Sequence, residues 1–475
     1  MSHTHFPPSN TFHHRVRSFF AIDEREPVVA YCQTAVGKIA LCVAAGLALQ
    51  LVTLVVQPDH RWWQVVAIIL AAAGMTYLPK HRSAILFAGT TFHSVTSLPP
   101  TVNAHVALAT FMIFAWGTLV LVRRNKSHVY ARRPVIALIF VIVGMFLISR
   151  LLPTGLLRSG VLALMWLINT YIWFIAYAIV DQRSRHVSSD MFQLGTMQPF
   201  WGATTTPFGK GAAFLRKTLS HTPRDLAITQ IKGIKLLVWA NILLGLKLFL
   251  LWLTVETLNL PPVEQAMTAY LRGEPYPILI GWAGIIAETV DFTLWLAVCG
   301  HAIVGTARLA GFRLPRNMCR PLEARTLAEF WNCYNFYFKE LMVDFFYIPT
   351  FLKTFRKHPR LRMFFSTLMA AGVGNFLYHF LQGIFLFEEI GFQSALDRFH
   401  ASYLFYCTVL AVAIGISQLR AHAGYEPSAT LVGRIKSFVV VWGFVFCLQV
   451  FASEGWTFSL GDRLSYMISL FGISI

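Results

Sequence analysis

The feature that most constrains this chain is a succession of long apolar segments separated by short and often basic loops. An apolar run of about 20 residues spans a bilayer as a helix, because lipid offers backbone amides no partner outside the helix itself. Of the 475 residues, 56% are hydrophobic and only 13% are charged, which is too little charge to cover a soluble protein of this size. The sequence therefore predicts an all-α, polytopic membrane protein.

The segments of spanning length predict about 11–12 transmembrane helices. They lie at residues 35–57, 62–79, 84–98, 104–122, 134–152, 159–180, 233–255, 276–307, 364–388, 401–418, 437–452 and 456–475. We expect a polar, cytoplasmic N-terminal segment at 1–34 and a single membrane-embedded domain at 35–475.

The charge of the chain predicts its orientation. Lysine and arginine number 40 against 22 acidic residues, a net charge of +18. Basic residues concentrate in alternate loops, which the positive-inside rule places on the cytoplasmic side together with the N-terminus. These loops are 80–82, 123–133, 181–232, 308–325, 353–362 and 419–436. Topology and contact with anionic membrane lipids explain this charge without any nucleic-acid partner.

The loop at 181–232 is the longest between apolar segments, and it leaves two interpretations open. Loops of this length are often functional, so it could receive an acidic cytosolic partner or donor. It could equally be a solvated basic loop lying near anionic lipid. Its Gly209-Lys210-Gly211 sequence lacks the flanking pattern of a phosphate-binding loop.

The seven cysteines are scattered and form no Cys-x-x-Cys pair. Most lie in or beside apolar segments, where cysteine behaves as a small buried apolar residue. We therefore expect no metal site.

The strongest candidate for chemistry is a polar face on the apolar segment at 364–388. Asn375, Tyr378, His379 and Gln382 have the i, i+3, i+4, i+7 spacing of one helix face. Polar groups at this depth usually face a bundle interior or a wet cavity, and a histidine there can move protons near neutral pH.

Residues 326–352 predict a second polar element, aromatic but too polar to face lipid all round. If they form one helix, Asn332, Asn335 and Lys339 share a polar face, whereas Trp331 belongs to an apolar one, and Asp344 follows. Thr326 has the spacing of a helix N-cap, and we expect Pro349 to end the helix. The segment is predicted to be a re-entrant or interfacial element beside a central tunnel.

A third polar position lies in the segment at 276–307. Glu288 and Asp291 are three residues apart, so they share a helix face. Two carboxylates inside a span predict either a polar cavity, with a proton or cation path, or carboxylates hydrogen-bonded to a neighbouring helix.

Two motifs resemble the membrane-bound O-acyltransferase family. Residues 305–317, GTARLAGFRLPRN, are similar to the stretch Gly-x-x-Arg-x-x-Gly-Phe-x-x-Pro-x-Asn of its bacterial members. Residues 321–331 are similar to the following stretch, Pro-x-x-Ala-x-Ser-x-x-x-Phe-Trp, with Thr326 in place of serine. The resemblance covers roughly 290–390 and indicates a divergent bacterial-type member, located in the bacterial inner membrane.

The resemblance implies roles for individual residues. His379 matches the family's active histidine, and Asn335 matches its second functional position, where many bacterial members have histidine. His301 stands where the family has an aspartate. The other residues expected to line a substrate tunnel are Asn375, Tyr378, Gln382, Trp331, Asn332, Lys339, Asp344, Glu288 and Asp291.

The expected reaction is acyl transfer from a thioester to a hydroxyl of a lipid, glycan or small molecule. His379 would be the general base, and Asn335 would orient the acceptor or stabilise the oxyanion. The thioester, on coenzyme A or an acyl-carrier protein, would arrive from the cytosolic side as a co-substrate, and no tightly bound cofactor is expected. The alternative is a transporter with Glu288, Asp291 and His379 along a proton or substrate path.

Overall fold

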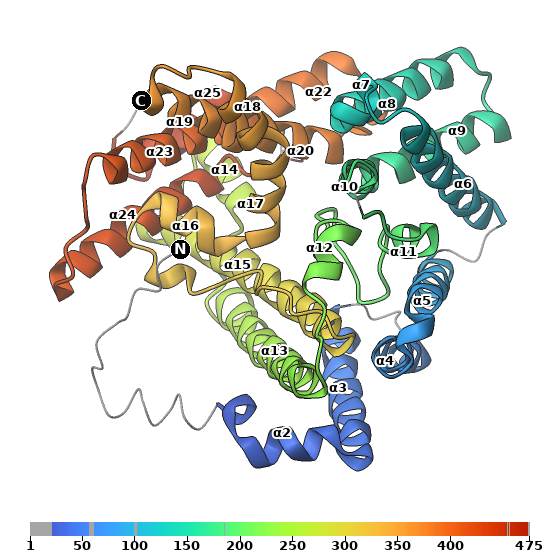
Figure 1. Cartoon of the computed structure of the whole chain (residues 1–475). Coiled ribbons are helices and arrows are strands. Elements are labelled where there is room, and N and C mark those ends of the chain that lie inside the picture. Colours follow the sequence, from blue (N-terminus) through green and yellow to red (C-terminus); the bar gives the residue numbers. More distant parts are fainter. Residues whose placement is uncertain are drawn as a thin grey trace.

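The computed structural model describes residues 21–56, 61–98, 102–184, 186–453, 455 and 457–473. Over these ranges the chain is helical and contains no strand, apart from one β-bridge that pairs Leu219 with Phe312. Figure 1 shows the helices as one bundle coloured along the sequence. The all-α prediction is confirmed.

The first half of the described chain contains the following elements, with η1 and η2 being 3-10 turns and η3 a π-helix. They are η1 (Ile22–Glu24), α2 (Glu26–Gln33), α3 (Ala35–Val56), α4 (Trp62–Tyr77), η2 (Pro79–His81), α5 (Arg82–Ser97), α6 (Val102–Arg124), α7 (Val129–Arg132), α8 (Pro134–Leu151), α9 (Leu156–Thr170), α10 (Ile172–Gln182), α11 (Asp190–Gly195), α12 (Ala212–Lys217), α13 (Pro223–Leu251) and η3 (Trp252–Thr257).

The second half contains three further π-helical segments, η5, η6 and η7, and one 3-10 turn, η4. Its elements are α14 (Val263–Leu271), α15 (Ile278–Leu309), η4 (Pro321–Glu323), α16 (Leu327–Tyr334), α17 (Phe336–Met342), η5 (Val343–Tyr347), α18 (Ile348–Lys353), α19 (Pro359–Thr367), η6 (Leu368–Gly374), α20 (Asn375–Gln382), α21 (Leu386–Glu389), α22 (Phe392–Phe399), η7 (His400–Leu404), α23 (Phe405–His422), α24 (Leu431–Gln449) and α25 (Leu460–Ser469).

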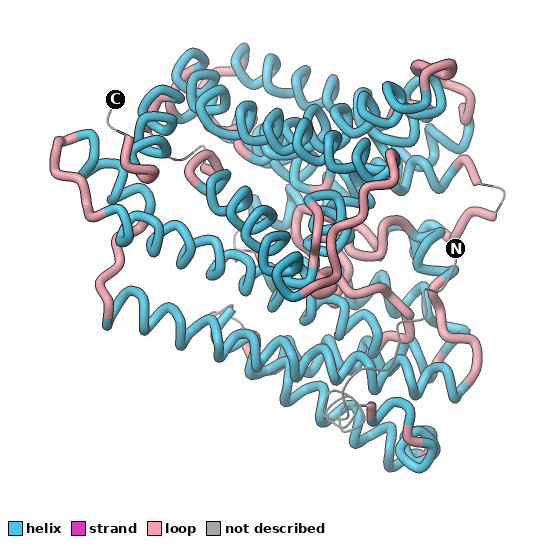
Figure 2. Tube along the Cα trace, turned by 90° about the vertical axis from the view of Figure 1, so that its left-hand side faces the viewer, coloured by secondary structure: helices cyan, strands magenta, loops and turns pink. Residues whose placement is uncertain are grey.

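The described chain is a multi-pass membrane protein. Eight of its helices are long and apolar enough to cross a membrane, or up to ten if each of two bent pairs counts as one span. The eight are Ala35–Val56, Ala104–Arg124, Pro134–Leu151, Pro223–Thr257, Ile278–Leu309, Pro359–Gln382, Phe392–His422 and Leu431–Gln449. The tube view in Figure 2 shows long helices lying side by side.

The number of spans is lower than the 11–12 predicted, for two geometric reasons. The segments at 62–79 and 84–98 form a single pair bent by 110°, because a proline turn at Pro79 interrupts the helix. The segment at 456–475 forms α25, whose ten residues are too few to cross a bilayer.

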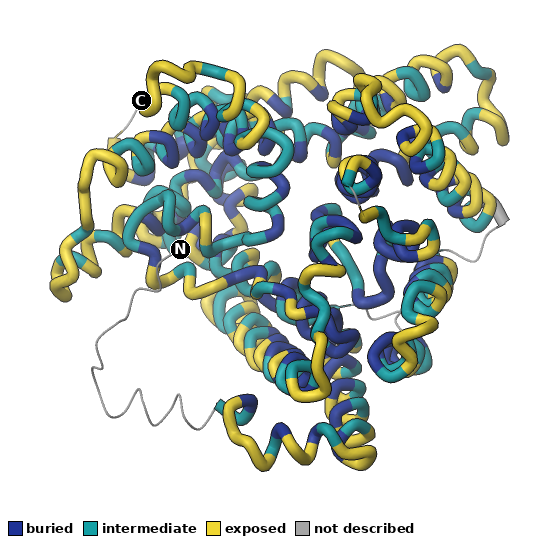
Figure 3. The backbone as a smooth tube through the Cα atoms, viewed as in Figure 1, coloured by how far each residue is buried: buried dark blue, intermediate teal, exposed yellow. Residues whose placement is uncertain are grey.

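The outer surface of the bundle fits a lipid environment. On α3, the side chains of Ile39, Val43, Leu47 and Leu51 follow one another at four-residue intervals, and each is more than half exposed. In water such a stripe would be a large exposed apolar patch. Figure 3 shows exposed residues along outer helices such as α6 and α13.

Small residues bring the two long helices α13 and α15 together. A Cβ atom on Gly233 would lie 2.8 Å from the carbonyl oxygen of Gly305, and a Cβ on Gly305 would lie 3.0 Å from that of Gly233. Close backbone approach at small residues is typical of packing between membrane helices. These two helices form the frame against which the loop after α11 is packed.

The described part of the expected polar segment 1–34 forms η1 and α2, and residues 1–20 lie outside the described residues. The Asp23 carboxylate forms ion pairs with Lys235 and Lys232 of α13. Burial alone would raise the pKa of Asp23, but these two lysines outweigh it and lower the pKa. The start of the described chain is therefore tied to α13.

The long loop at 181–232 is built into the bundle, which corrects its interpretation as a solvated basic loop. Between α11 and α12, residues 199–211 form a segment that we call the strap. Its aromatic side chains Phe200, Trp201 and Phe208 are each less than 5% exposed. Figure 3 shows this stretch as largely buried. The strap is therefore part of the core.

Candidate functional site

The polar face predicted at 375–382 lies on α20, the last part of the span Pro359–Gln382. A π-helical segment, η6, precedes it and contains Gly372 and Gly374. Gly374 lets η5 pack closely, since a Cβ there would lie 2.6 Å from the ring of Phe346. The predicted helix to residue 388 is too long, because α20 ends at Gln382 and Gly383 caps it. π-Helical segments are frequent at functional sites.

One edge of the α20 face is bonded to the strap. The hydroxyl of Tyr378 shares hydrogen bonds with Thr205 Oγ1 at 2.5 Å and Thr206 Oγ1 at 2.9 Å. The side-chain amide of Gln382 donates to Thr205 Oγ1 at 2.8 Å. The Tyr378 ring also stacks on Trp173 of α10, with centroids 6.1 Å apart. Tyr378 and Gln382 are therefore held in place by these partners.

The other edge of the face carries His379. Its imidazole lies flat against the ring of Tyr403 in η7, with centroids 3.8 Å apart and planes 6° apart. Tyr403 is itself anchored, because its hydroxyl donates to the carbonyl of Ala452 at 2.9 Å. No hydrogen-bond partner for either ring nitrogen of His379 occurs among the described residues. The ring is thus oriented by stacking and keeps both nitrogens available.

Asn375 begins the same face and is 2% exposed. Within the described chain, its Oδ1 atom has no hydrogen-bond partner. Buried polar atoms are normally paired, so an unpaired one invites an explanation such as a bound ligand or water. Asn375 and His379 therefore both keep polar atoms without a hydrogen-bond partner among the described residues.

Asn335 interrupts the predicted helix at 326–352. Its backbone angles, φ −143° and ψ 85°, are not helical, and it separates α16 from α17. Its Oδ1 accepts a hydrogen bond from the backbone amide of Phe338 at 3.4 Å, which caps α17. The prediction of one helix with Asn332, Asn335 and Lys339 on a shared face is therefore wrong. The prediction of a helix pair fits the observed break.

Two other expectations for this element have different outcomes. Thr326 is the N-cap of α16, since its side chain accepts from the amide of Glu329 at 3.1 Å. Pro349 does not end the helix, which continues through α18 to Lys353. The π-helical turns of η5 come directly before α18, and Pro349 is the second residue of α18.

Asn335 reaches the neighbourhood of His379 through aromatic contacts. The ring of Phe338, whose amide Asn335 caps, lies edge-on to Tyr378 with centroids 4.8 Å apart. Trp331 packs edge-on against the same Phe338 ring, whereas Asn332 is exposed. Among the described residues, no hydrogen bond joins Asn335 to His379. A direct meeting of the two at a substrate stays a prediction.

Lys339 and Asp344 belong to a cluster of charges with Lys210 of the strap. Lys210 Nζ lies 2.9 Å from Glu340 Oε2 and 2.8 Å from Asp344 Oδ2, and Lys339 Nζ lies 2.5 Å from Glu340 Oε1. Tyr177 of α10 donates to Asp344 Oδ2 at 2.7 Å. The cluster joins the strap, α10 and α17.

Burial and ion pairing shift the pKa values of this cluster in opposite directions. Burial would lower the pKa of Lys210, but Asp344 and Glu340 outweigh it and raise the pKa above its ordinary value. Burial would raise the pKa of Glu340, yet Lys339 and Lys210 lower it. Lys210 also has a left-handed backbone, with φ 56°, which is uncommon for a residue with a side chain. The ion pairs hold this strained residue, and with it the end of the strap.

The remaining predicted residues lie away from α20 and have partners of their own. Glu288 accepts a hydrogen bond from the backbone amide of Val263 at 2.7 Å, and Asp291 pairs with Lys247 of α13 at 2.7 Å. The Nδ1 of His301 lies 2.6 Å from the carbonyl oxygen of Ala297, one turn earlier in α15. These three groups bond to different helices or to their own.

Sequence reasoning missed the residues that surround the face from other elements. They are Thr205, Thr206 and Lys210 of the strap, Tyr177 of α10 and Tyr403 of η7. The two glycines beside Lys210 could have indicated a special backbone at 209–211, where Gly209 has φ 95°. The sequence offers no signal for the pairing of Tyr403 with His379, because it depends on the packing of separate helices.

The site holds the imidazole of His379 in a fixed orientation, with ring nitrogens that have no partner in the described chain. Hydroxyl groups and aromatic rings of other residues lie around it. Such a group can take a proton from a hydroxyl brought within hydrogen-bond reach. Among the described residues, no three His, Cys, Asp or Glu side chains converge as a metal site would require.

In comparisons with known proteins, the chain matches no family model, and no curated protein matches it.

Proposed function

We propose that the protein is a membrane-bound O-acyltransferase that moves an acyl group from a thioester to a hydroxyl, with His379 as general base. The donor is acyl-coenzyme A or an acyl-carrier protein on the cytosolic side, and the acceptor is a lipid, glycan or small molecule. We place the protein in a bacterial inner membrane with its N-terminus in the cytoplasm, from the basic loops and the family resemblance.

One observation carries the proposal: His379 is oriented by its stacking on Tyr403, and its ring nitrogens have no partner in the described chain. A general base needs a free nitrogen in a fixed direction, whereas a structural histidine uses its nitrogens for hydrogen bonds. His301 is the contrasting case, since its Nδ1 is held by its own helix. This difference supports His379 and not His301 as the reacting group.

The proposed reaction uses His379 and Asn335 in sequence. The acceptor oxygen attacks the thioester carbonyl carbon while its proton passes to an imidazole nitrogen of His379. The carbonyl oxygen becomes an oxyanion, and the Asn335 amide NH₂ donates to it, since its Oδ1 is already used by Phe338. The intermediate then expels the thiolate, which takes the proton from His379. The products are the ester and a free thiol.

The experiment is turnover by the purified protein in lipid nanodiscs. An acyl-thioester is supplied with and without hydroxyl acceptors, and free thiol and ester are both measured. We expect thiol release that depends on acceptor and is lost in His379→Ala. The matched control is His301→Ala, which removes a histidine from another span and should retain turnover. Equal turnover by His379→Ala and the wild type would refute the assignment.

The transport alternative has weaker support. Its carboxylates, Glu288 and Asp291, bond to Val263 and Lys247 at separate interfaces and share no path with His379 among the described contacts. Gradient-driven uptake into vesicles without thiol release would nevertheless favour it over acyl transfer.

A further inference from the structure

A cavity of about 240 Å³ lies beside the strap. Its walls come from α3, α4, α5, α15 and the strap residues Phe200–Thr204. An apolar cavity of about 150 Å³ is large enough to bind benzene, so this one has room for a larger molecule. Nothing in the reaction described above uses it.

The lining of the cavity is apolar on one side and neutral but polar on the other. Val52 of α3 and Val298 and Ile303 of α15 supply apolar surface. Polar groups come from α5 and from Gln198, just before the strap. Gln198 accepts a hydrogen bond from Ser94 at 3.0 Å, which leaves its NH₂ group without a partner in the described chain. A ligand oxygen is the kind of group that would pair with this donor.

No lysine, arginine, aspartate or glutamate lines the cavity among the described residues. Burying a charged group without a partner is costly, so a phosphate, carboxylate or ammonium group would not be stable there. A neutral polar head joined to an apolar chain fits both sides of the lining. This excludes the phosphate-bearing end of a coenzyme A donor as the occupant.

The strap connects this cavity to the candidate site. Thr204 lines the cavity, and the next two residues, Thr205 and Thr206, bond Tyr378 beside His379. We propose that the cavity binds a neutral amphiphilic alcohol and that this alcohol is the acyl acceptor. The acceptor role rests on the proposed function, whereas the ligand class rests on the lining alone.

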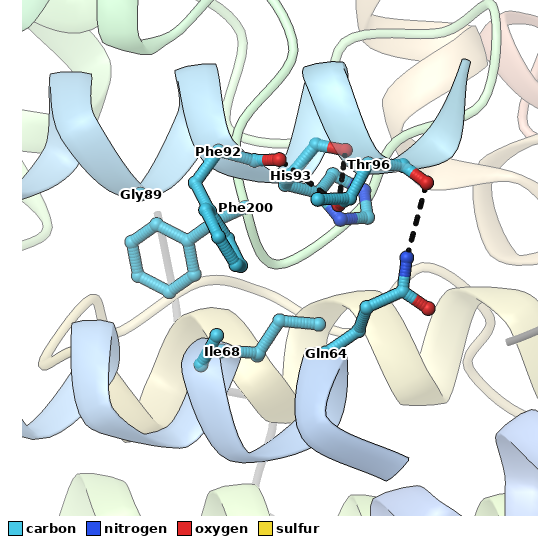
Figure 4. A pocket seen from close by; sticks show the side chains of 8 residues that line it. Gln64, Ile68, Gly89, Phe92, His93, Thr96 and Phe200 are labelled. Carbon is cyan, nitrogen blue, oxygen red and sulfur yellow. Dashed lines mark hydrogen bonds between the residues drawn. The ribbon is translucent and has the colours of Figure 1, made fainter. Parts of the chain in front are cut away.

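A smaller void lies next to the cavity, on the side of its polar lining residues. Figure 4 shows this void between α4 and α5, with Phe200 of the strap beside Gly89 and with His93 close to Thr96. Its volume is about 20 Å³, enough for one water, and it shares His93, Ile68 and Phe200 with the larger cavity. His93 therefore lies where a polar head and a water could meet.

Cys299 provides a direct readout because it lines the cavity. The full-length protein in lipid nanodiscs is treated with N-ethylmaleimide, and alkylation of Cys299 is followed by mass spectrometry. The probe is 1-decanol, and decanoate is the matched charged probe. At ten times its Kd, decanol should slow alkylation about tenfold, since about one cavity in ten is then empty. Decanoate should leave the rate unchanged.

Two controls separate occupancy of the cavity from other effects. Cys319 is exposed and does not line the cavity, so its alkylation should not respond to decanol. Ala302→Phe fills the cavity and should weaken decanol binding at least about tenfold by calorimetry, because the apolar contact surface is lost. Ile286→Phe, on an exposed position of the same helix, should bind decanol like the wild type.

The outcomes distinguish the two proposals. Protection of Cys299 by decanol without thiol release would overturn the acyltransferase and leave the ligand class standing. Thiol release with decanol as acceptor but no protection of Cys299 would overturn the cavity as the acceptor site. Equal protection by decanoate, or no alkylation of Cys299 even without decanol, would also overturn it.

Discussion

The helices α15 and α20 both carry polar side chains inside apolar spans, but these side chains differ in whether they have hydrogen-bond or ion-pair partners. In the middle of α15, Glu288 and Asp291 are both satisfied, one by a backbone amide and the other by a lysine. In α20, the ring nitrogens of His379 and the Oδ1 of Asn375 have no hydrogen-bond partners among the described residues. A paired group stabilises the fold, whereas an unpaired one is available to a ligand. Polar side chains within a span therefore indicate a functional site only when it is known which of them lack hydrogen-bond partners.

The strongest test of this contrast is the loss of the imidazole. His379→Ala should keep the protein folded and lower turnover at least about a hundredfold, the low end for a positioned general base. Folding is checked by thermal unfolding in detergent and turnover by thiol release. Retained turnover would mean that the free nitrogens of α20 are not used in catalysis.

The next effect should come from the ring beneath the imidazole. Tyr403→Leu removes the stacked surface, so His379 loses its fixed direction and kcat should fall about tenfold. Tyr403→Phe keeps the ring and removes the hydroxyl that donates to Ala452, so it should recover most of the activity. If leucine and phenylalanine have the same effect, stacking does not orient the histidine.

A smaller effect should follow from releasing the strap. Lys210→Met removes both ion pairs to α17 and η5, so Thr205 and Thr206 lose part of their support against Tyr378. We expect kcat to fall about threefold and the melting temperature to drop, with Lys210→Arg retaining both values better. Unchanged kcat with a lower melting temperature would limit Lys210 to a structural role.

The pH dependence of this variant gives a further check. The pKa of Glu340 is lowered below its ordinary value of 4.5, so its contribution to stability is present above pH 4.5 and is lost as the pH falls through the depressed pKa. The pKa of Lys210 is raised above 10.5, so its contribution persists until the pH exceeds that value. The difference in melting temperature between wild type and Lys210→Met should therefore stay constant near neutral pH and shrink in acid.

The smallest effect is expected on α15. Asp291→Asn breaks the ion pair with Lys247 and leaves the lysine without its carboxylate, so it should lower the melting temperature. Turnover should stay within about twofold of the wild type, because this carboxylate has no part in the proposed reaction. A loss of turnover comparable to that of His379→Ala would remove the contrast between the two helices.

The sequence predicted the fold class correctly, and it predicted that residues 375–382 are helical, because both depend on local pattern. Apolar length predicts a membrane helix, and the i, i+3, i+4, i+7 spacing at 375–382 lies within the regular helix α20. The spacing argument failed at Asn335, where the side chain caps a new helix instead of continuing the old one. Asparagine competes for backbone amides in this way, and hydrophobic periodicity does not record it.

What the sequence could not provide is the set of contacts between distant elements. Composition classed the 181–232 loop as basic, yet its aromatic residues Phe200 and Trp201 fill the core. Glu288 and Asp291 look alike as carboxylates within a span, and only the positions of Val263 and Lys247 show that each is satisfied. Whether these residues are buried and paired depends on contacts with residues far away in the sequence, and a single sequence does not show those contacts.

The π-helical turns have a consequence for how the helix can vary. The segment η6 lies between α19 and α20, and a wider turn uses more residues to cover the same arc. Each residue of an α-helix advances the side chains by about 100°, from 3.6 residues per turn. Deleting one residue within 368–374 would therefore let ordinary α-helical turns cover the same arc, so His379 should keep its direction toward Tyr403 while the span stays long enough to cross the bilayer.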